Sequence, residues 1–177
     1  MDNAGKLSVP VKMFNYRLTA TGYKVFMKLC DMYGFENEFI TVYKDIARET
    51  GVTTERVKKV MPRLMREGII KKINEELWQH TRYKLNKIDG DYFTIDRKML
   101  YEMENPYYLQ FYCAICSFAK DNVTPYITLK DLSERSGLHA VTLEKYCKMF
   151  NNVWVRIKII ETAEEEKGEY KFKFELI

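Results

Sequence analysis

Cationic and hydroxyl side chains gather between residues 44 and 63, and together they suit a polyanionic ligand. Lys and Arg side chains neutralise phosphates or pair with guanine, and Thr hydroxyls contact base edges or phosphates. These residue types therefore favour contact with nucleic acid. The expected contacts in this stretch are Lys44, Arg48, Thr53, Thr54, Arg56, Lys58, Lys59 and Arg63.

A second group of cations follows on a predicted hairpin. Ile69–Ile73 has the pattern of a strand, Asn74–Glu76 that of a turn, and Leu77–Leu85 alternates as a returning strand. We expect such a hairpin, placed beside a helix that contacts DNA, to meet the neighbouring phosphate backbone. The expected contacts here are Lys71, Lys72, Arg82 and Lys84.

The elements that must position these residues occur twice, because the chain matches itself at an offset of 86 residues. Lys12-Met13-Phe14 aligns with Lys98-Met99-Leu100, and Lys44-Asp45-Ile46 aligns with Lys130-Asp131-Leu132. The repeat predicts two small domains, residues 1–88 and 89–177. Residues 86–91 form the predicted boundary between them.

The centre of each copy has the pattern of a helix-turn-helix. This motif needs a small residue where its helices cross, a Gly at the turn and two apolar residues on the second helix. A hairpin follows in each copy, which is the order of a winged helix. The predicted fold class is therefore α+β, mainly α, with two tandem winged helix-turn-helix domains. The motif residues are Ala47, Gly51, Val57 and Val60 in copy one, and Ser133, Gly137, Leu143 and Tyr146 in copy two.

Other elements follow from apolar periodicity and capping residues. Each copy opens with a short apolar segment that favours a strand or extended arm, and three helices precede its hairpin. Pro62 is expected to kink the third helix of copy one or end its regular part. The expected ranges in copy one are Leu7–Val11, a helix capped by Thr19 and ending at Tyr33, a helix from Thr41 or Val42 to Thr50, and a helix from Thr53 or Thr54 to Glu67.

Copy two has the corresponding elements and a longer hairpin. Thr41 and Thr128 are the N-cap candidates of the second helices. The expected ranges in copy two are Tyr92–Ile95, a helix capped by Asn105 and reaching about Lys120, a helix over Thr128–Ser136, and strands over Val153–Ile160 and Glu169–Leu176 with a tip at Ala163–Gly168.

The two copies differ in charge. Residues 1–88 carry 17 Lys and Arg against 10 Asp and Glu, a net charge of +7, whereas residues 89–177 carry 12 against 15, a net charge of −3. Copy one is therefore the better candidate to meet a polyanion. Copy two offers His139, Lys145 and Lys148 for DNA, but Glu144 takes the place of Lys58. Copy two is either a second DNA site or a module that binds a protein partner.

Little in the sequence points to a metal, a cofactor or catalysis. Cys113 and Cys116 form a C-x-x-C pair within an apolar helix, which favours buried core thiols over a zinc or redox site. His80 and His139 have no partner at the spacing of a nucleophile and its base, and no phosphate-binding loop is present. We expect no cofactor and no enzymatic activity. The N-terminal residues and the absence of a long apolar run favour a cytoplasmic protein without membrane contact.

The chain resembles two groups of winged-helix proteins. Val9–Phe14 and Leu18–Phe26 are similar to the start of the DNA-binding domain of plasmid and phage replication initiators, many of which carry tandem winged helices. Asp45–Gly51 and Leu64–Ile70 also resemble winged-helix transcription regulators. The resemblance implies a sequence-specific binder of double-stranded DNA from a bacterial plasmid or phage, acting at an origin or operator, with oligomers allowed. The alternative is a winged-helix adaptor between proteins, with little or no DNA binding.

Overall fold

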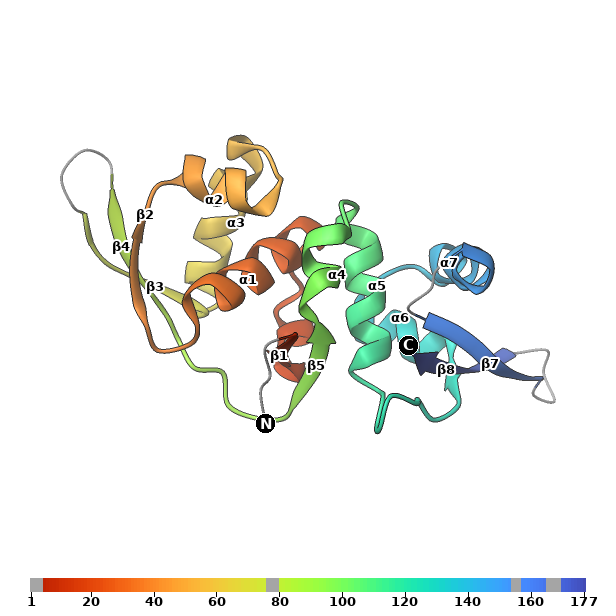
Figure 1. The fold of residues 1–177 in the computed structure, drawn as a ribbon. Helices are drawn as coiled ribbons and strands as arrows, with labels where there is room; N and C mark the ends of the chain where they lie inside the picture. Colours follow the sequence, from red (N-terminus) through yellow and green to blue (C-terminus); the bar gives the residue numbers. More distant parts are fainter. Residues whose placement is uncertain (1–4, 76–79, 154–156, 165–169) are drawn as a thin grey trace. The chain divides into compact units, whose positions relative to one another are not determined.

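The computed structural model describes residues 5–75, 80–153, 157–164 and 170–177. Within these residues the fold is α+β, with seven α-helices, one 3-10 helix and three small antiparallel sheets (Figure 1). The α+β fold class predicted from the sequence is therefore confirmed.

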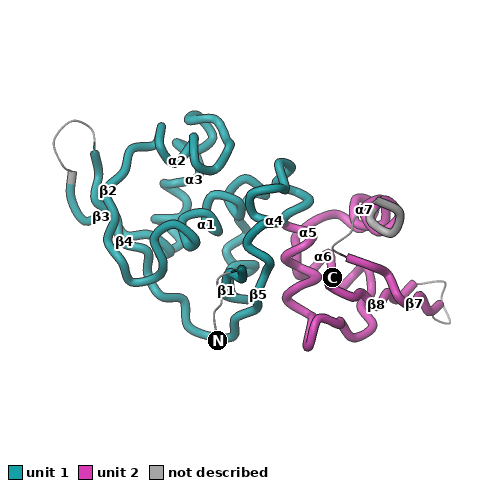
Figure 2. Tube along the Cα trace, in the orientation of Figure 1, with its two compact units in different colours: residues 1–109 teal, residues 110–177 magenta. Residues whose placement is uncertain are grey.

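Two compact units make up the chain, residues 1–109 and residues 110–177 (Figure 2). The sequence placed a boundary between residues 88 and 89, well before this division. The difference arises because strand β5 (Tyr92–Asp96) pairs along its whole length with β1 (Lys6–Pro10). Helix α4 (Arg97–Glu102) follows β5 and packs against α1 (Ala20–Tyr33). The opening segment of copy two therefore belongs to unit 1.

The elements repeat along the chain as the sequence predicts. β1 and β5 begin at Lys6 and Tyr92, which are 86 residues apart, and four pairs of helices keep the same offset. Those pairs are the 3-10 helix η1 (Val11–Tyr16) with α4, α1 with α5 (Pro106–Cys116), α2 (Tyr43–Thr50) with α6 (Leu129–Ser136), and α3 (Thr54–Arg66) with α7 (Ala140–Val153).

Strands β1 and β5 are the equivalent segments of the two copies, and they pair with each other. The strands are antiparallel, and Ser8 lies opposite Thr94, its own counterpart 86 residues later. Leu7, Val9, Phe93 and Ile95 are buried on the inner face of the pair. The two segments predicted as opening strands or arms are thus strands, and each covers the other.

Each copy contains a three-stranded sheet, with strand orders β2-β4-β3 and β6-β8-β7. Each contains a short strand that the sequence did not predict, because these strands gain their hydrogen bonds from a distant hairpin. The strands are β2 (Glu38–Thr41), β3 (Ile70–Glu75) and β4 (Thr81–Leu85) in copy one, and β6 (Ile127–Thr128), β7 (Ile157–Glu164) and β8 (Tyr170–Leu176) in copy two.

Strand β7 begins and ends later than the sequence predicts. In copy two α7 continues to Val153, so β7 begins at Ile157 and includes Ala163 and Glu164, which the prediction placed in the tip. In copy one the predicted turn and the start of its returning strand fall partly on residues 76–79, which lie outside the described residues. The remaining tip of the second hairpin, residues 165–169, also lies outside them.

Helix caps agree with the predictions at three places and differ at one. The Thr19 hydroxyl accepts a hydrogen bond from the Gly22 amide (3.1 Å), and the Asn105 side chain accepts one from the Tyr107 amide (3.0 Å). Thr128 forms a capping box with Asp131. The prediction of Thr41 as a cap is wrong, because Val42 precedes α2 at the position equivalent to Thr128. Helix α5 also ends at Cys116, short of the predicted Lys120.

Each unit buries its own apolar core. In unit 1, Phe26 and Leu29 of α1 are fully buried together with Val57 and Leu64 of α3. In unit 2, α5, α6, α7 and β8 are held together by four equally buried residues, namely Phe111, Leu132, Leu143 and Phe174. The apolar positions of the predicted helix-turn-helix pattern are all buried, so this pattern identifies the core of both copies correctly.

Candidate nucleic-acid interface

The turn between α2 and α3 positions the cationic helix of unit 1. Gly51 ends α2 in the left-handed conformation (φ 65°), and its amide donates hydrogen bonds to the carbonyls of Ala47 and Arg48. The amide of Val52 also donates to the Ala47 carbonyl (3.2 Å). Thr53 then caps α3, because its hydroxyl accepts a hydrogen bond from the Arg56 amide (3.4 Å). The predicted contact Thr53 thus already serves as the cap of this helix.

Helix α3 has one buried face and one cationic face. Val57, Val60, Met61 and Leu64 form the buried face. The exposed side chains include Arg56, Lys58, Lys59, Pro62 and Arg66. Amphipathic helices of this kind pack through one stripe and present the other to solvent or to a ligand.

Pro62 lies on the exposed face of α3, and the helix continues beyond it to Arg66. The predicted end of the regular helix at Pro62 is therefore wrong. A proline removes the hydrogen bond to the carbonyl four residues earlier, which here belongs to Lys58. Because this carbonyl lies on the exposed side, water can satisfy it.

The predicted cations of α2 and α3 divide into paired and unpaired groups. Lys58 Nζ lies 2.9 Å from Glu55, and Arg48 contacts both Asp45 and Glu49 at 3.2 Å. Among the described residues, no ion pair involves the exposed side chains of Lys44, Arg56 or Lys59. Thr54 is half-buried at the start of α3. The unpaired cations are the ones best able to meet phosphate without first losing an intramolecular partner.

Arg63 is turned towards the protein. Its Nη2 donates a hydrogen bond to the carbonyl of Arg17, a residue in the left-handed conformation (φ 47°) between η1 and α1. The Nε atom of Arg63 is buried. The structure therefore places this predicted contact where it joins α3 to the entry of α1.

The hairpin cations of unit 1 face carboxylates of the unpredicted β2 region. Arg82 lies 3.5 Å from Glu38, and Lys84 lies 2.9 Å from Glu36. The Lys84 side chain and the Lys87 amide both bond to Glu36 and lower the pKa of its carboxyl. Lys71 and Lys72 on β3 are exposed. Sequence reasoning missed Glu36 and Glu38, because only the β2–β4 pairing brings them beside the hairpin.

The equivalent surface of unit 2 is poorer in free cations. His139 and Lys145 are exposed, but Lys148 forms an ion pair with Glu144 (2.6 Å). Val141 at the start of α7 is 81% exposed and replaces Glu55 of the first copy. The structure thus places Lys145 and Lys148 on α7 and His139 directly before it, and the same helix displays an apolar residue and a carboxylate.

Two buried lysines of α1 lie behind the interface and were not singled out by the sequence. Lys24 Nζ donates a hydrogen bond to the Glu104 carbonyl (3.1 Å), and Lys28 Nζ lies 3.0 Å from the centroid of the Tyr101 ring. Burial lowers the pKa of Lys24 and lowers the pKa of Lys28 to about 8. The available sequence signal was their spacing of four residues on a largely apolar helix.

Asp31 completes this cluster. Its carboxylate lies 2.7 Å from Arg97 Nε and accepts a hydrogen bond from the Tyr101 hydroxyl. That hydrogen bond is the main cause that raises the pKa of Tyr101 to about 12. The cluster joins α1 to α4 within unit 1.

The four cysteines are all free and buried, as predicted. Burial raises the pKa of the Cys116 and Cys147 thiols to about 12. Cys113 and Cys30 are shifted in the same direction for the same reason. Such thiols are protonated at neutral pH and are poor nucleophiles and metal ligands.

Comparison with protein families and curated proteins assigns no function to this site. No family model matches the sequence, and no curated protein matches it. None of the helices in the described part of the chain has the length and apolar character needed to cross a bilayer. Across the same residues, no group of three His, Cys, Asp or Glu side chains is placed to hold a metal ion.

Proposed function

We propose that this chain is a tandem winged helix-turn-helix protein that binds double-stranded DNA through α3 of unit 1. The observation that carries the proposal is the set of Lys44, Arg56 and Lys59 around a glycine turn, which are exposed and form no ion pair with any described residue. In a helix-turn-helix, the second helix enters the major groove. A basic side chain there reads guanine or neutralises phosphate.

The order of elements supports the same proposal. The α2–turn–α3 segment is followed by the β3–β4 hairpin, as the recognition helix of a winged helix is followed by its wing. Lys71 and Lys72 lie on the exposed part of β3. The proposed setting is a bacterial plasmid or phage, with binding at a replication origin or an operator.

The test compares two charge-matched double variants in a fluorescence anisotropy assay with duplexes selected from a random pool. Arg56→Glu with Lys59→Glu is expected to weaken binding at least 100-fold, because two cations on the contact face become repulsive. Lys12→Glu with Lys98→Glu makes the same change in net charge at exposed sites on η1 and α4, and we expect less than a threefold effect. Equal losses in the two variants would overturn the assignment of α3.

The second candidate function is a winged-helix adaptor between proteins. It is favoured by one observation, namely that Arg48, Lys58, Arg82, Lys84 and Lys148 are all engaged in ion pairs. An adaptor of this kind would show no duplex affinity at 50 mM salt. Salt-dependent duplex binding by the unchanged protein separates the two functions.

A further inference from the structure

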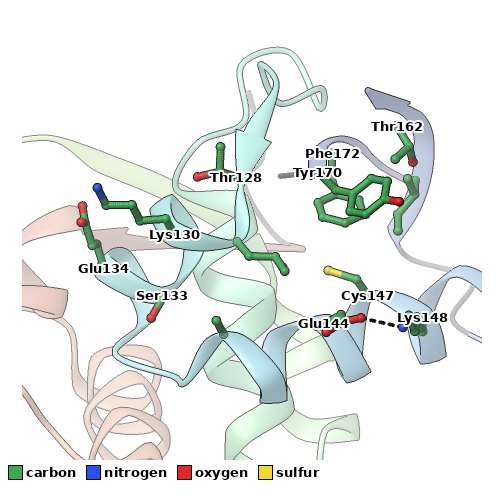
Figure 3. Close-up of a pocket in the computed structure, with 13 residues that line it drawn as sticks. Thr128, Lys130, Ser133, Glu134, Glu144, Cys147, Lys148, Thr162, Tyr170 and Phe172 are labelled. Carbon is green, nitrogen blue, oxygen red and sulfur yellow. Dashed lines mark hydrogen bonds and ion pairs between the residues drawn. The ribbon is translucent and has the colours of Figure 1, made fainter. Parts of the chain in front are cut away.

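Unit 2 contains a groove between helices α6 and α7 and the β7–β8 hairpin (Figure 3). Its volume is about 940 Å³. In Figure 3 the rings of Tyr170 and Phe172 lie above Cys147. The apolar lining consists of Leu129, Ala140, Cys147, Ile159, Tyr170 and Phe172.

The groove exists because the inner face of the hairpin extends beyond the helices. Tyr170, Phe172 and Phe174 alternate along β8 and therefore share one face. Phe174 is buried in the core, Phe172 is half-buried and Tyr170 is 51% exposed. On the neighbouring strand, Thr162 pairs with Phe172. The same sheet face is thus covered near the core and uncovered further along the hairpin.

Two carboxylates line the groove, and a third lies opposite one of its lining residues on the hairpin. Glu134 lies on α6 and Glu144 on α7, and Glu164 pairs with Tyr170 across the hairpin. Two lysines also line the groove: Lys148 is held by Glu144 at 2.6 Å, and Lys130 lies on α6.

The first copy has opposite charges at two of these positions. The counterparts of Glu134 and Glu144, 86 residues earlier, are Arg48 and Lys58. The residue equivalent to Ala140 is the polar Thr54. The face of the second and third helices is therefore cationic in unit 1. In unit 2 the same face has an apolar centre, and its rim carries both carboxylates and lysines. An apolar centre with a polar rim is the composition of a protein-binding surface, and carboxylates repel DNA phosphates.

We propose that this groove binds an amphipathic helix of a partner protein, with an apolar face and flanking Lys or Arg residues. The lining combines side chains of α6 and α7 with side chains from the face, and not the edge, of the β7–β8 hairpin. A helix is the element that covers a sheet face in α+β proteins. Aromatic side chains such as Tyr170 supply the anchoring contacts of many interfaces. The proposal goes beyond DNA binding by unit 1 and does not depend on it.

The test is selection of phage-displayed 16-residue random peptides on the full-length protein, followed by affinity measurement with synthetic peptides. We expect enriched peptides with apolar residues at helical spacing (i, i+3 or i+4, i+7) and a net positive charge. Tyr170→Ser is expected to weaken their binding at least tenfold, and Glu134→Lys several-fold. Tyr126→Ser, which removes an exposed tyrosine of unit 2 outside the groove, is the matched control and should change affinity less than twofold.

Circular dichroism and the melting temperature of each variant show whether unit 2 keeps its fold, and Glu134→Lys keeps the test valid if Tyr170→Ser does not fold. Failure to enrich any peptide, a consensus of acidic peptides, or equal affinity for the unchanged protein and the groove variants would overturn the proposal. Weaker duplex binding caused by Tyr170→Ser would also overturn it, because the groove would then belong to the DNA surface.

Discussion

Lys28 shows how a single buried charge affects unit 1. Its side chain is buried against the Tyr101 ring, where Asp31 and Glu49 favour the charged form and Lys24 opposes it. Desolvation is the largest effect and lowers its pKa to about 8. An unfolded lysine titrates at about 10.4. Below pH 8 the folded protein therefore holds a charge that the unfolded chain solvates better.

This pKa shift predicts a pH dependence of stability. Between pH 8 and about 10.4 the unfolded chain binds more protons at Lys28 than the folded protein, so Lys28 makes the free energy of unfolding rise with pH. Lys28→Met should remove this rise and increase the free energy of unfolding at pH 7 by about 1 kcal/mol. Urea unfolding across this pH range measures both effects, with the exposed Lys98→Met as the control. A pH profile of Lys28→Met that parallels the control would contradict the assignment.

Arg63 gives a second prediction at the residue scale. Because its guanidinium donates to the Arg17 carbonyl, Arg63→Gln should lower the free energy of unfolding by about 2 kcal/mol. Arg66 lies three residues later on α3 and is exposed, so Arg66→Gln should change the free energy of unfolding by less than about 0.5 kcal/mol. Chemical denaturation compares the two. If the Arg63→Gln protein were as stable as Arg66→Gln but bound DNA more weakly, the structural role of Arg63 would be contradicted and its predicted contact with DNA supported.

Ion pairs between residues distant in the sequence were the part of the site that the sequence could not predict. The pairs Glu55–Lys58 and Glu144–Lys148 lie three and four residues apart on one helix, within reach of sequence reasoning. Glu36–Lys84 instead requires the pairing of β2 with β4, which no local pattern records. The cationic character of the interface is thus visible in the sequence, whereas the availability of each cation depends on long-range strand pairing.

At the scale of secondary-structure elements, the two turn glycines allow the most specific prediction about stability. Gly51 and Gly137 both have a positive φ, 65° and 74°, and no atom lies closer than 4.0 Å to an added Cβ at either position. Backbone strain is therefore the main penalty for a side chain. Gly51→Ala and Gly137→Ala should each lower the free energy of unfolding by about 1–2 kcal/mol.

The matched control for these variants is Gly5→Ala, where an added Cβ meets no neighbour and φ is not positive. Thermal unfolding monitored by circular dichroism measures the difference. If Gly51→Ala were as stable as Gly5→Ala, the left-handed turn between α2 and α3 would be contradicted.

Helices were predictable because their periodicity and caps are local. The starts of α2, α3 and α6 agree with the sequence to within two residues, since glycines and capping residues surround short apolar stripes. The short strands β2 and β6, the 3-10 helix η1 and helix α4 were missed. Each of these elements is six residues or shorter and depends on partners that are distant in the sequence.

For the whole molecule, the repeat conserves buried residues and changes exposed ones. Phe26 and Leu29 of α1 correspond to Tyr112 and Ile115 of α5, and all four are buried. The exposed Lys58 corresponds to Glu144 and the exposed Glu55 to Val141. One scaffold thus carries two surfaces of different chemistry, and we propose that the first binds DNA and the second a protein helix.

The most direct test of DNA binding by unit 1 is the salt dependence of its affinity. The logarithm of the binding constant falls with the logarithm of salt concentration, by about 0.9 for each phosphate contacted. Arg56→Gln with Lys59→Gln should therefore reduce the slope by up to about 1.8, while Lys12→Gln with Lys98→Gln leaves it unchanged. Anisotropy titrations from 50 to 300 mM salt measure both slopes. A slope in the first variant equal to that of the unchanged protein would contradict the central claim.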